Sequence, residues 1–199
     1  MGWLDSVGGV SADFVAGAKR PEYQATGWDG TLPCIAAGAQ CADGISTLQM
    51  DSDISAGNTD LSIYLVIDKT NSIASQYLFD SEAGRTLIAT GDSSEFMSYR
   101  SDAGWETSTN TLAVLGKQCV TLIAEAGAGA LYVNRVLVES GGWTQQPIAG
   151  ATNFFSHNNS SSSYWDGLCA AIFVYGEAHN AGQSTAVHDY INSVWGVAA

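Results

Sequence analysis

Short apolar runs separated by turn residues are the feature that most constrains this chain. Turn signals built from Gly, Asp and Ser recur at short intervals; they include 28–30, 42–44, 82–84, 102–104 and 140–142. The runs between them are only a few residues long and are rich in Leu, Ile, Val, Phe and Tyr. Many short strands with this spacing predict an antiparallel, all-β sandwich or barrel.

The clearest strand is predicted over 61–68, LSIYLVID. Because successive side chains of a strand point to opposite faces, its Leu and Ile residues share one face, and Tyr64 and Val66 share the other. Both sets are apolar, so we expect this strand to be covered on both sides. Further strands are predicted over 119–125, 130–134, 136–140 and 168–175.

The chain changes its period after the last of these strands. From Ala181 onward the apolar residues have the spacing of one helix face. They are Val187, Tyr190, Ile191, Val194 and Trp195. Asn180 is a suitable N-cap, Gln183 completes a capping box, and Gly196 is a suitable stop. The sequence therefore predicts one short C-terminal helix, with its apolar face packed on the strand before it.

The balance of charge argues against one class of partner. The 199 residues include 7 basic and 20 acidic ones, which gives a formal net charge of −13. A chain with so few cations has no patch with which to neutralise phosphates, so nucleic acid is not expected as a partner. No apolar run is long enough to cross a bilayer, so membrane insertion is not expected either. We interpret the acidity as a means of staying soluble.

The N-terminal residues and the cysteines indicate where the chain is made. The first residues contain Asp5 and neither the basic nor the apolar segment of a signal peptide, so we expect synthesis in a cytoplasm without one. Cys119 and Cys169 lie in apolar runs, where a thiol acts as a small hydrophobe. Cys34 and Cys41 flank a short loop and could pair after release from a cell, but four reduced thiols are the favoured interpretation.

Three stretches, in order along the chain, resemble a known family. Residues 20–48 contain a Pro-x-Tyr, a small turn and a strand leading to Asp-Gly, and 121–140 are similar to a hairpin of two short strands. Residues 163–196 combine an aromatic-Asp-Gly, a strand ending in Val-Tyr, and an amphipathic helix ending in Trp-Gly. The chain resembles the concanavalin A-like lectin/glucanase superfamily, specifically its LamG-like jelly rolls. The resemblance implies an antiparallel two-sheet jelly-roll sandwich over 20–199, with one short C-terminal α-helix.

Two features depart from this family. The hairpin turn has Asn134-Arg135 where the family usually has Asn-Gly, and a type I′ turn with Arg there costs on the order of 1 kcal/mol. Either the turn is of another type or Arg135 is kept for a contact; a surface Arg in a relaxed longer turn is the favoured interpretation. Residues 1–19 are short and Gly/Ala-rich, so we expect them to supply no edge strand and to form an N-terminal arm that orders against a partner.

The sequence lacks the catalytic carboxylates of the glucanase branch. That branch carries Glu-x-Asp-x-Glu on one strand, which places its acid and nucleophile on the same face. The nearest approach is Asp51 and Asp53, which lack a glutamate and are interpreted as a solvated turn. The histidines, His157, His179 and His188, are scattered, and we expect His188 to face outward from the helix. No catalytic residue is predicted.

Calcium is the cofactor to consider, because relatives often hold it with loop oxygens. The candidate ligands are Asp51, Asp53 and Asp60 in one region, and Asp92 and Glu95 in another. Neither group has a recognisable ligand spacing, so no metal or other cofactor is expected.

Sugar binding needs an exposed aromatic ring beside hydrogen-bonding groups. Trp105 and Trp143 lie in polar, Gly-flanked surroundings, and Asn153, His157 and Asn158 offer polar partners in a nearby loop. These five residues are the predicted glycan site, with a core or interface role for the two tryptophans as an equal alternative. The tryptophans expected to be structural are Trp28, Trp165 and Trp195.

A lectin-like jelly roll without export signal or enzyme motif leads to one functional hypothesis. We expect a non-enzymatic virion surface protein of a phage or phage-like particle, either a head decoration or spike or a tail-associated adhesin. It would contact other virion proteins through the N-terminal arm and bind cell-surface polysaccharide or another host-surface ligand. A capsid cement protein with no ligand and a carbohydrate-active enzyme of the glucanase branch are the alternatives, and homo-oligomer formation is left open.

Overall fold

Two antiparallel sheets make up the body of the molecule. The computed structural model describes residues 3–4, 11–14, 22–37, 48–50, 60–70, 76–83, 87–90, 96–100, 104–107, 115–125, 127–141, 149–155 and 165–197. Within these ranges the strands form an eight-stranded and a seven-stranded sheet, and every strand pairing is antiparallel. The expected jelly-roll sandwich is confirmed.

The chain crosses between the two sheets several times, so neighbouring strands of a sheet are often not consecutive in the sequence. Across the eight-stranded sheet the order is β1 (Trp3–Leu4), β2 (Ser11–Phe14), β5 (Leu48–Met50), β14 (Ala149–Phe154), β7 (Gln76–Ala83), β8 (Leu87–Thr90), β9 (Phe96–Arg100) and β10 (Gly104–Thr107). Across the seven-stranded sheet it is β13 (Val136–Gly141), β12 (Ala128–Val133), β11 (Gly116–Glu125), β6 (Leu61–Lys69), β15 (Gly167–Tyr175), β4 (Leu32–Ala37) and β3 (Glu22–Trp28).

Strand β6 lies at the centre of the seven-stranded sheet, between β11 and β15. Its Leu and Ile residues pack into the apolar cluster between the two sheets, together with residues such as Phe79 and Phe154 of the eight-stranded sheet. Tyr64 and Val66, on the opposite face, belong to a second apolar cluster and are also fully buried. The expectation that this strand is covered on both faces is therefore confirmed.

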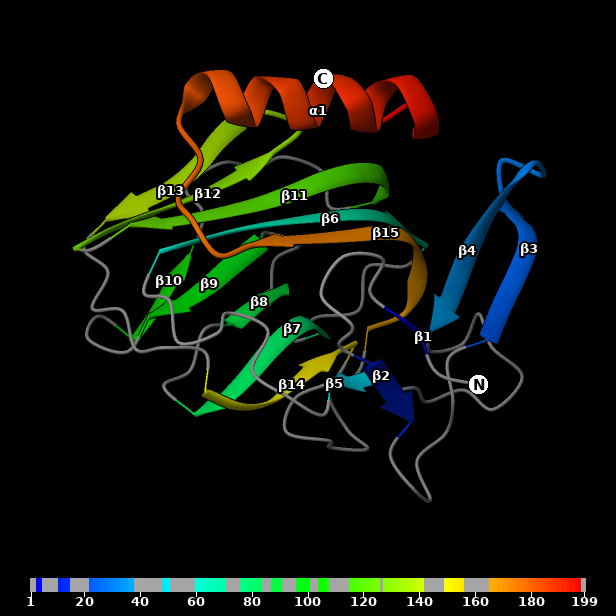
Figure 1. Cartoon of the computed structure of the whole chain (residues 1–199), viewed down its shortest axis with the longest axis horizontal. Helices are drawn as coiled ribbons and strands as arrows, with labels where there is room; N and C mark the ends of the chain where they lie inside the picture. The colour runs from blue at the N-terminus through cyan, green and yellow to red at the C-terminus, as the bar shows by residue number, and fades with distance from the viewer. Residues whose placement is uncertain are drawn as a thin grey trace.

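The second cluster is covered by the helix α1 (Ala181–Trp195), which lies on the far side of the seven-stranded sheet from the other sheet (Figure 1). Its N-terminus has the predicted capping box between Asn180 and Gln183, and Gly196 ends it in the left-handed conformation. The helix contributes Ile191 as its buried apolar residue, and Val187 and Trp195 pack on the cluster's rim. Among the described residues, no helix is both long and apolar enough to cross a bilayer.

The N-terminal residues pair within the sandwich. Strands β1 and β2 form one edge of the eight-stranded sheet, and β2 pairs with β5. The expectation that 1–19 supply no edge strand is therefore wrong. Alternation of polar and apolar residues is too weak over two short strands to reveal the pairing from sequence. The boundary between an N-terminal arm over 1–19 and a domain over 20–199 stays a prediction.

The hairpin between β12 and β13 turns on Asn134 and Arg135 alone. Both residues have positive φ, 49° and 67°, as a type I′ turn requires. The Asn134 side chain accepts a hydrogen bond from the Cys119 backbone N–H at 2.8 Å, and the Arg135 guanidinium binds the Asp189 carboxylate of α1. The favoured relaxed turn is therefore wrong, and a contact made by Arg135 accounts for its place in the tight turn.

Three of the four cysteines lie in the part of the chain that the structure describes. Cys34, Cys119 and Cys169 are buried free cysteines. Burial raises the pKa of all three, to about 12 for Cys119 and for Cys169, so none is a reactive thiolate at neutral pH. Cys41, the predicted alternative partner of Cys34, lies outside the described residues.

Candidate functional site

The sheet order separates two of the predicted glycan residues. Trp105 lies in β10, opposite Tyr99 of β9, and Asn153 lies in β14, between β5 and β7. Four inter-strand spacings of about 4.8 Å separate β10 from β14, which puts their backbones roughly 19 Å apart. Trp105 and Asn153 therefore lie too far apart for a single sugar ring to contact both.

The rest of the predicted site and most calcium candidates fall outside the described residues. These are Trp143, His157 and Asn158 for glycan, and Asp51, Asp53, Asp92 and Glu95 for calcium. Asp60 is described and partly exposed, just before β6. Within the part of the chain that the structure describes, no three His, Cys, Asp or Glu side chains converge as a metal site would require. Both predicted sites remain predictions.

The three tryptophans expected to be structural do have structural roles. Trp28 and Trp165 are fully buried, and Trp195 is partly buried on the outer cluster. The Trp28 indole N–H donates to the Trp195 backbone carbonyl at 3.1 Å, which joins the β3–β4 hairpin to the end of α1. Gly167, next to Trp165, has no room for a Cβ, because that atom would lie 2.5 Å from the Asp68 carbonyl oxygen of β6. The aromatic-Asp-Gly motif thus lets β15 approach β6 closely.

A buried lysine lies beside this motif, at the end of β6. Lys69 is 2% exposed; its ammonium contacts the Gln76 side-chain oxygen of β7 and lies 4.8 Å from the centre of the Trp165 ring. Burial lowers the pKa of Lys69 to about 8, and the Asp166 carboxylate partly opposes this shift. Lys69 of β6 thus links the two sheets. Its ammonium contacts the Gln76 amide of β7 and the Trp165 ring, and the buried Asp166 carboxylate stabilises its charge.

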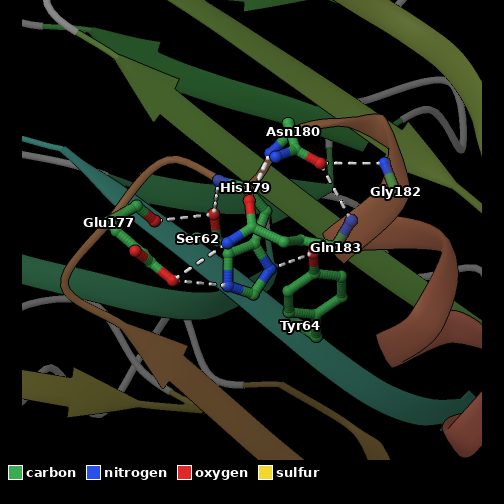
Figure 2. A network of polar contacts seen from close by, with 7 residues as sticks. All are labelled: Ser62, Tyr64, Glu177, His179, Asn180, Gly182 and Gln183. Atoms are coloured by element: carbon green, nitrogen blue, oxygen red, sulfur yellow. Dashed lines mark hydrogen bonds and ion pairs between the residues drawn. The ribbon is translucent and has the colours of Figure 1, made fainter.

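The segment that enters α1 is held by a polar network on the first residues of β6 (Figure 2). The Ser62 hydroxyl donates to the Glu177 backbone carbonyl at 2.9 Å and accepts from the His179 backbone N–H at 2.8 Å. The Tyr64 hydroxyl lies 2.8 Å from His179 Nδ1, and His179 Nε2 faces the Glu177 carboxylate at 3.6 Å. We assign the ring proton to Nε2, toward the carboxylate, which leaves Nδ1 to accept from Tyr64.

This network brings together a serine, a histidine and a glutamate, but not as a hydrolase does. Both hydrogen bonds of the Ser62 hydroxyl go to backbone groups, so the imidazole of His179 is not its base. Burial raises the pKa of Tyr64 to about 12, so the phenol is not an acid at neutral pH. The geometry anchors the segment before α1 and leaves no activated nucleophile.

The second helix contact is made by His188, which is 4% exposed and faces the sheet. Its Nε2 lies 3.2 Å from the Thr121 hydroxyl of β11, and its ring packs edge-on against Tyr64. The expectation that His188 faces outward is wrong, because a hydroxyl on the sheet satisfies the imidazole where the helix meets it. Burial, with the nearby Arg135 cation, lowers the pKa of His188 to about 4, against a smaller opposing effect of Asp189.

Aromatic side chains gather where β15 and α1 meet. We call the set the aromatic strip; it consists of Phe173, Tyr175, Tyr190 and Trp195. The rings of Phe173, Tyr190 and Trp195 contact one another in pairs, with centroids 5.9 to 6.2 Å apart and planes near perpendicular. Burial raises the pKa of Tyr175, and the adjacent Tyr190 hydroxyl adds to the rise. Tyr190 is 55% exposed, so the strip opens to solvent at this ring.

Sequence reasoning missed the aromatic strip because it assigned these rings to the helix face and the closing strand. The signal was present: Phe173 and Tyr175 alternate on one strand face, so both point toward the helix that follows. Tyr190 and Trp195 lie five residues apart on that helix, on the same side as the strand. The two periods together predict one cluster, but neither shows that a ring stays exposed.

Comparisons with known proteins identify the fold. No protein-family model and no curated protein sequence matches this chain. Among solved structures it is similar to a heptameric SAP-like pentraxin from Limulus polyphemus, with 15% identity and a TM-score of 0.62 over 78% of this chain and 81% of that one. It is also similar to domain 4 of a GH43 extracellular arabinanase from Geobacillus stearothermophilus in complex with arabinotriose, with 15% identity and a TM-score of 0.67 over 92% and 91%.

A third similar structure is the Trypanosoma rangeli sialidase, with 12% identity and a TM-score of 0.68. The match covers 94% of this chain but 30% of the sialidase, so the chain spans less than a third of that protein's length. Identities this low show a shared fold alone. It is an antiparallel jelly-roll sandwich.

Proposed function

We propose that this protein binds glycans without hydrolysing them. The observation that carries the proposal is the jelly-roll sandwich itself, which is shared with a pentraxin and with a domain captured with arabinotriose. The sequence supports the absence of hydrolysis, because it lacks the Glu-x-Asp-x-Glu pattern of the glucanase branch. A partly exposed aromatic cluster supports sugar binding, because sugar rings stack their apolar faces on such side chains.

A glycan array combined with a reducing-end assay tests this function. The intact protein should retain at least one class of oligosaccharide on the array. The same preparation, incubated with the corresponding polysaccharide, should release no new reducing ends over hours. Failure to bind any glycan would contradict the binding proposal, and a steady release of reducing ends would instead support the enzyme of the glucanase branch.

We further propose that the protein is displayed on the surface of a phage or phage-like particle, as a head decoration or spike or a tail-associated adhesin. Its buried free thiols support folding in a reducing compartment, where such particles assemble. Other virion proteins would dock on the N-terminal residues, which form an edge of the eight-stranded sheet. Capsid and tail genes beside the gene for this protein would support the proposal, and their absence would count against it.

The second candidate function is a capsid cement protein with no ligand. It is favoured by Val136 and Leu137, each 47% exposed on β13 at one edge of the seven-stranded sheet. Apolar residues on an exposed strand edge suit packing between neighbouring subunits. Binding to assembled particles together with a silent glycan array would favour this candidate.

A further inference from the structure

Within the part of the chain that the structure describes, strand β15 has an open edge along half of its length. It pairs with β6 as far as Tyr175, but with β4 only through Gly167–Cys169. Along Ala171–Tyr175, no strand of the described chain lies against the edge that faces away from β6. Phe173 and Tyr175 are accordingly only partly buried, although they point toward α1. The aromatic strip therefore lies beside an opening rather than inside a closed core.

The exposed ring of the aromatic strip is Tyr190. Phe173, Tyr190 and Trp195 pack with interplanar angles of 69° to 85°, so the edge of one ring meets the face of another in each pair. Tyr190 has more than half of its surface exposed and is held in place by the other two rings. A fixed, exposed ring face is what a pyranose or furanose stacks on, at low entropic cost.

A carboxylate lies at one end of the aromatic strip. Glu177, 62% exposed, lies at the Tyr175 end through its contact with His179. Asp189, 65% exposed, precedes Tyr190 but is paired with Arg135, so its charge is compensated. The other cations whose side chains the structure describes lie elsewhere: Lys117 binds Asp29, and Lys69 is buried between the sheets. The Glu177 carboxylate can accept hydrogen bonds from neutral sugar hydroxyls and would repel an acidic sugar.

We propose that the aromatic strip beside the open edge of β15 is a binding site for an uncharged oligosaccharide, with Tyr190 as the stacking platform. The site differs from the predicted one on Trp105 and Trp143. The proposal rests on the proposed glycan-binding function and adds the location of the site and the class of sugar. The Glu177 carboxylate should disfavour sialylated and uronic-acid glycans.

Three variants test the location of the site. Tyr190→Ala removes the ring from an exposed position and should weaken binding of the best neutral oligosaccharide about tenfold, which corresponds to the loss of one stacking contact. Tyr190→Phe keeps the ring and should stay within about twofold of the wild type. Tyr23→Ala is the matched control, because Tyr23 is 64% exposed on the edge strand β3, in register with the Cys169 end of β15 rather than with Tyr175, and should change nothing. Titration calorimetry measures affinity, and thermal melting confirms that each variant is folded.

The sugar class is tested with matched neutral and acidic probes. A neutral glucan or arabinan oligosaccharide should bind with an affinity that hardly changes with ionic strength, while sialyllactose and oligogalacturonate should not bind. Preferential binding of the acidic probes would overturn the proposed class of sugar but not the location of the site. Unchanged neutral binding by Tyr190→Ala would overturn the location alone, and a wild-type protein that binds no probe would overturn the glycan-binding function as well.

Discussion

At the scale of single residues, two uncharged histidines join α1 to the sheet. His179 lies against Tyr64 and Glu177, and His188 lies against Thr121. The helical period correctly predicted Val187, Ile191 and Trp195 on the packed face. It also placed there Tyr190, which is 55% exposed, and it left out His188, because a histidine is polar. Its partner, the Thr121 hydroxyl, is 67 residues away in the sequence, so no local pattern could reveal this contact. Burial of a polar side chain depends on such distant partners.

The environment of His188 makes the free energy of unfolding depend on pH. The folded pKa, about 4, lies below the ordinary value of 6.5, so the unfolded chain binds a proton first as the pH falls. The contribution of neutral His188 to the free energy of unfolding should be complete above pH 6.5 and should decline between pH 6.5 and 4, by at most about 3 kcal/mol. Urea unfolding at a series of pH values measures this loss.

His188→Gln is the matched variant, since its amide can still bond Thr121 but does not titrate in this range. The difference in unfolding free energy between wild type and variant isolates His188 from the carboxylates, including neighbouring Asp189. A difference that stays constant from pH 7 to pH 4 would contradict the assignment. His179, whose pKa burial also lowers, contributes to both proteins alike.

At the scale of elements, the helix and its ends followed closely from local sequence. The capping box at Asn180 and the left-handed Gly196 were predicted because caps depend on backbone groups within one turn. The β12–β13 hairpin was predicted as well, but not its type, because the strain at Arg135 is offset by Asp189 on a distant helix. Local sequence patterns therefore predicted the elements, whereas contacts between elements decided exceptions such as the turn at Arg135.

The N-cap can be measured directly. Asn180→Ala should lower the unfolding free energy by about 1 kcal/mol, because the side chain accepts from the backbone N–H groups of Gly182 and Gln183. Thr185→Ala, on the exposed side of α1, serves as the control and should stabilise slightly through helix propensity. Chemical denaturation of both variants checks this; equal effects of the two substitutions would contradict the cap's role.

At the scale of the whole molecule, the sandwich could be predicted from the sequence, and the aromatic strip could not. The turn spacing indicated a sandwich of short strands. The apolar residues on both faces of β6 indicated that this strand is covered on both sides, because burial leaves a pattern along a whole strand. The predicted site joined Trp105 and Asn153 on local polarity alone, yet sheet order places their strands four positions apart. The aromatic strip arises because β4 leaves β15 after three paired residues, a feature of topology that no single segment encodes.

Net charge sets a further property of the molecule as a whole. A chain with a formal charge of −13 repels itself when compact, and salt screens this repulsion over a Debye length of about 10 Å at 0.1 M. The melting temperature should therefore rise with sodium chloride from low to moderate ionic strength and then level off. Scanning calorimetry measures this, with sucrose as an uncharged control; a melting temperature that falls over this range would contradict it.

The bond from the Trp28 indole to the Trp195 carbonyl has a consequence for how the chain acquires its fold during synthesis. Among the described elements, α1 is the last to leave the ribosome, yet it covers the outer face of β6, which emerges in the first third of the chain. Until the helix arrives, a nascent chain must carry Trp28, Tyr64 and Val66 uncovered. Completion of the fold then waits for translation to pass residue 195, and stalled chains are the ones most exposed to aggregation and chaperone capture.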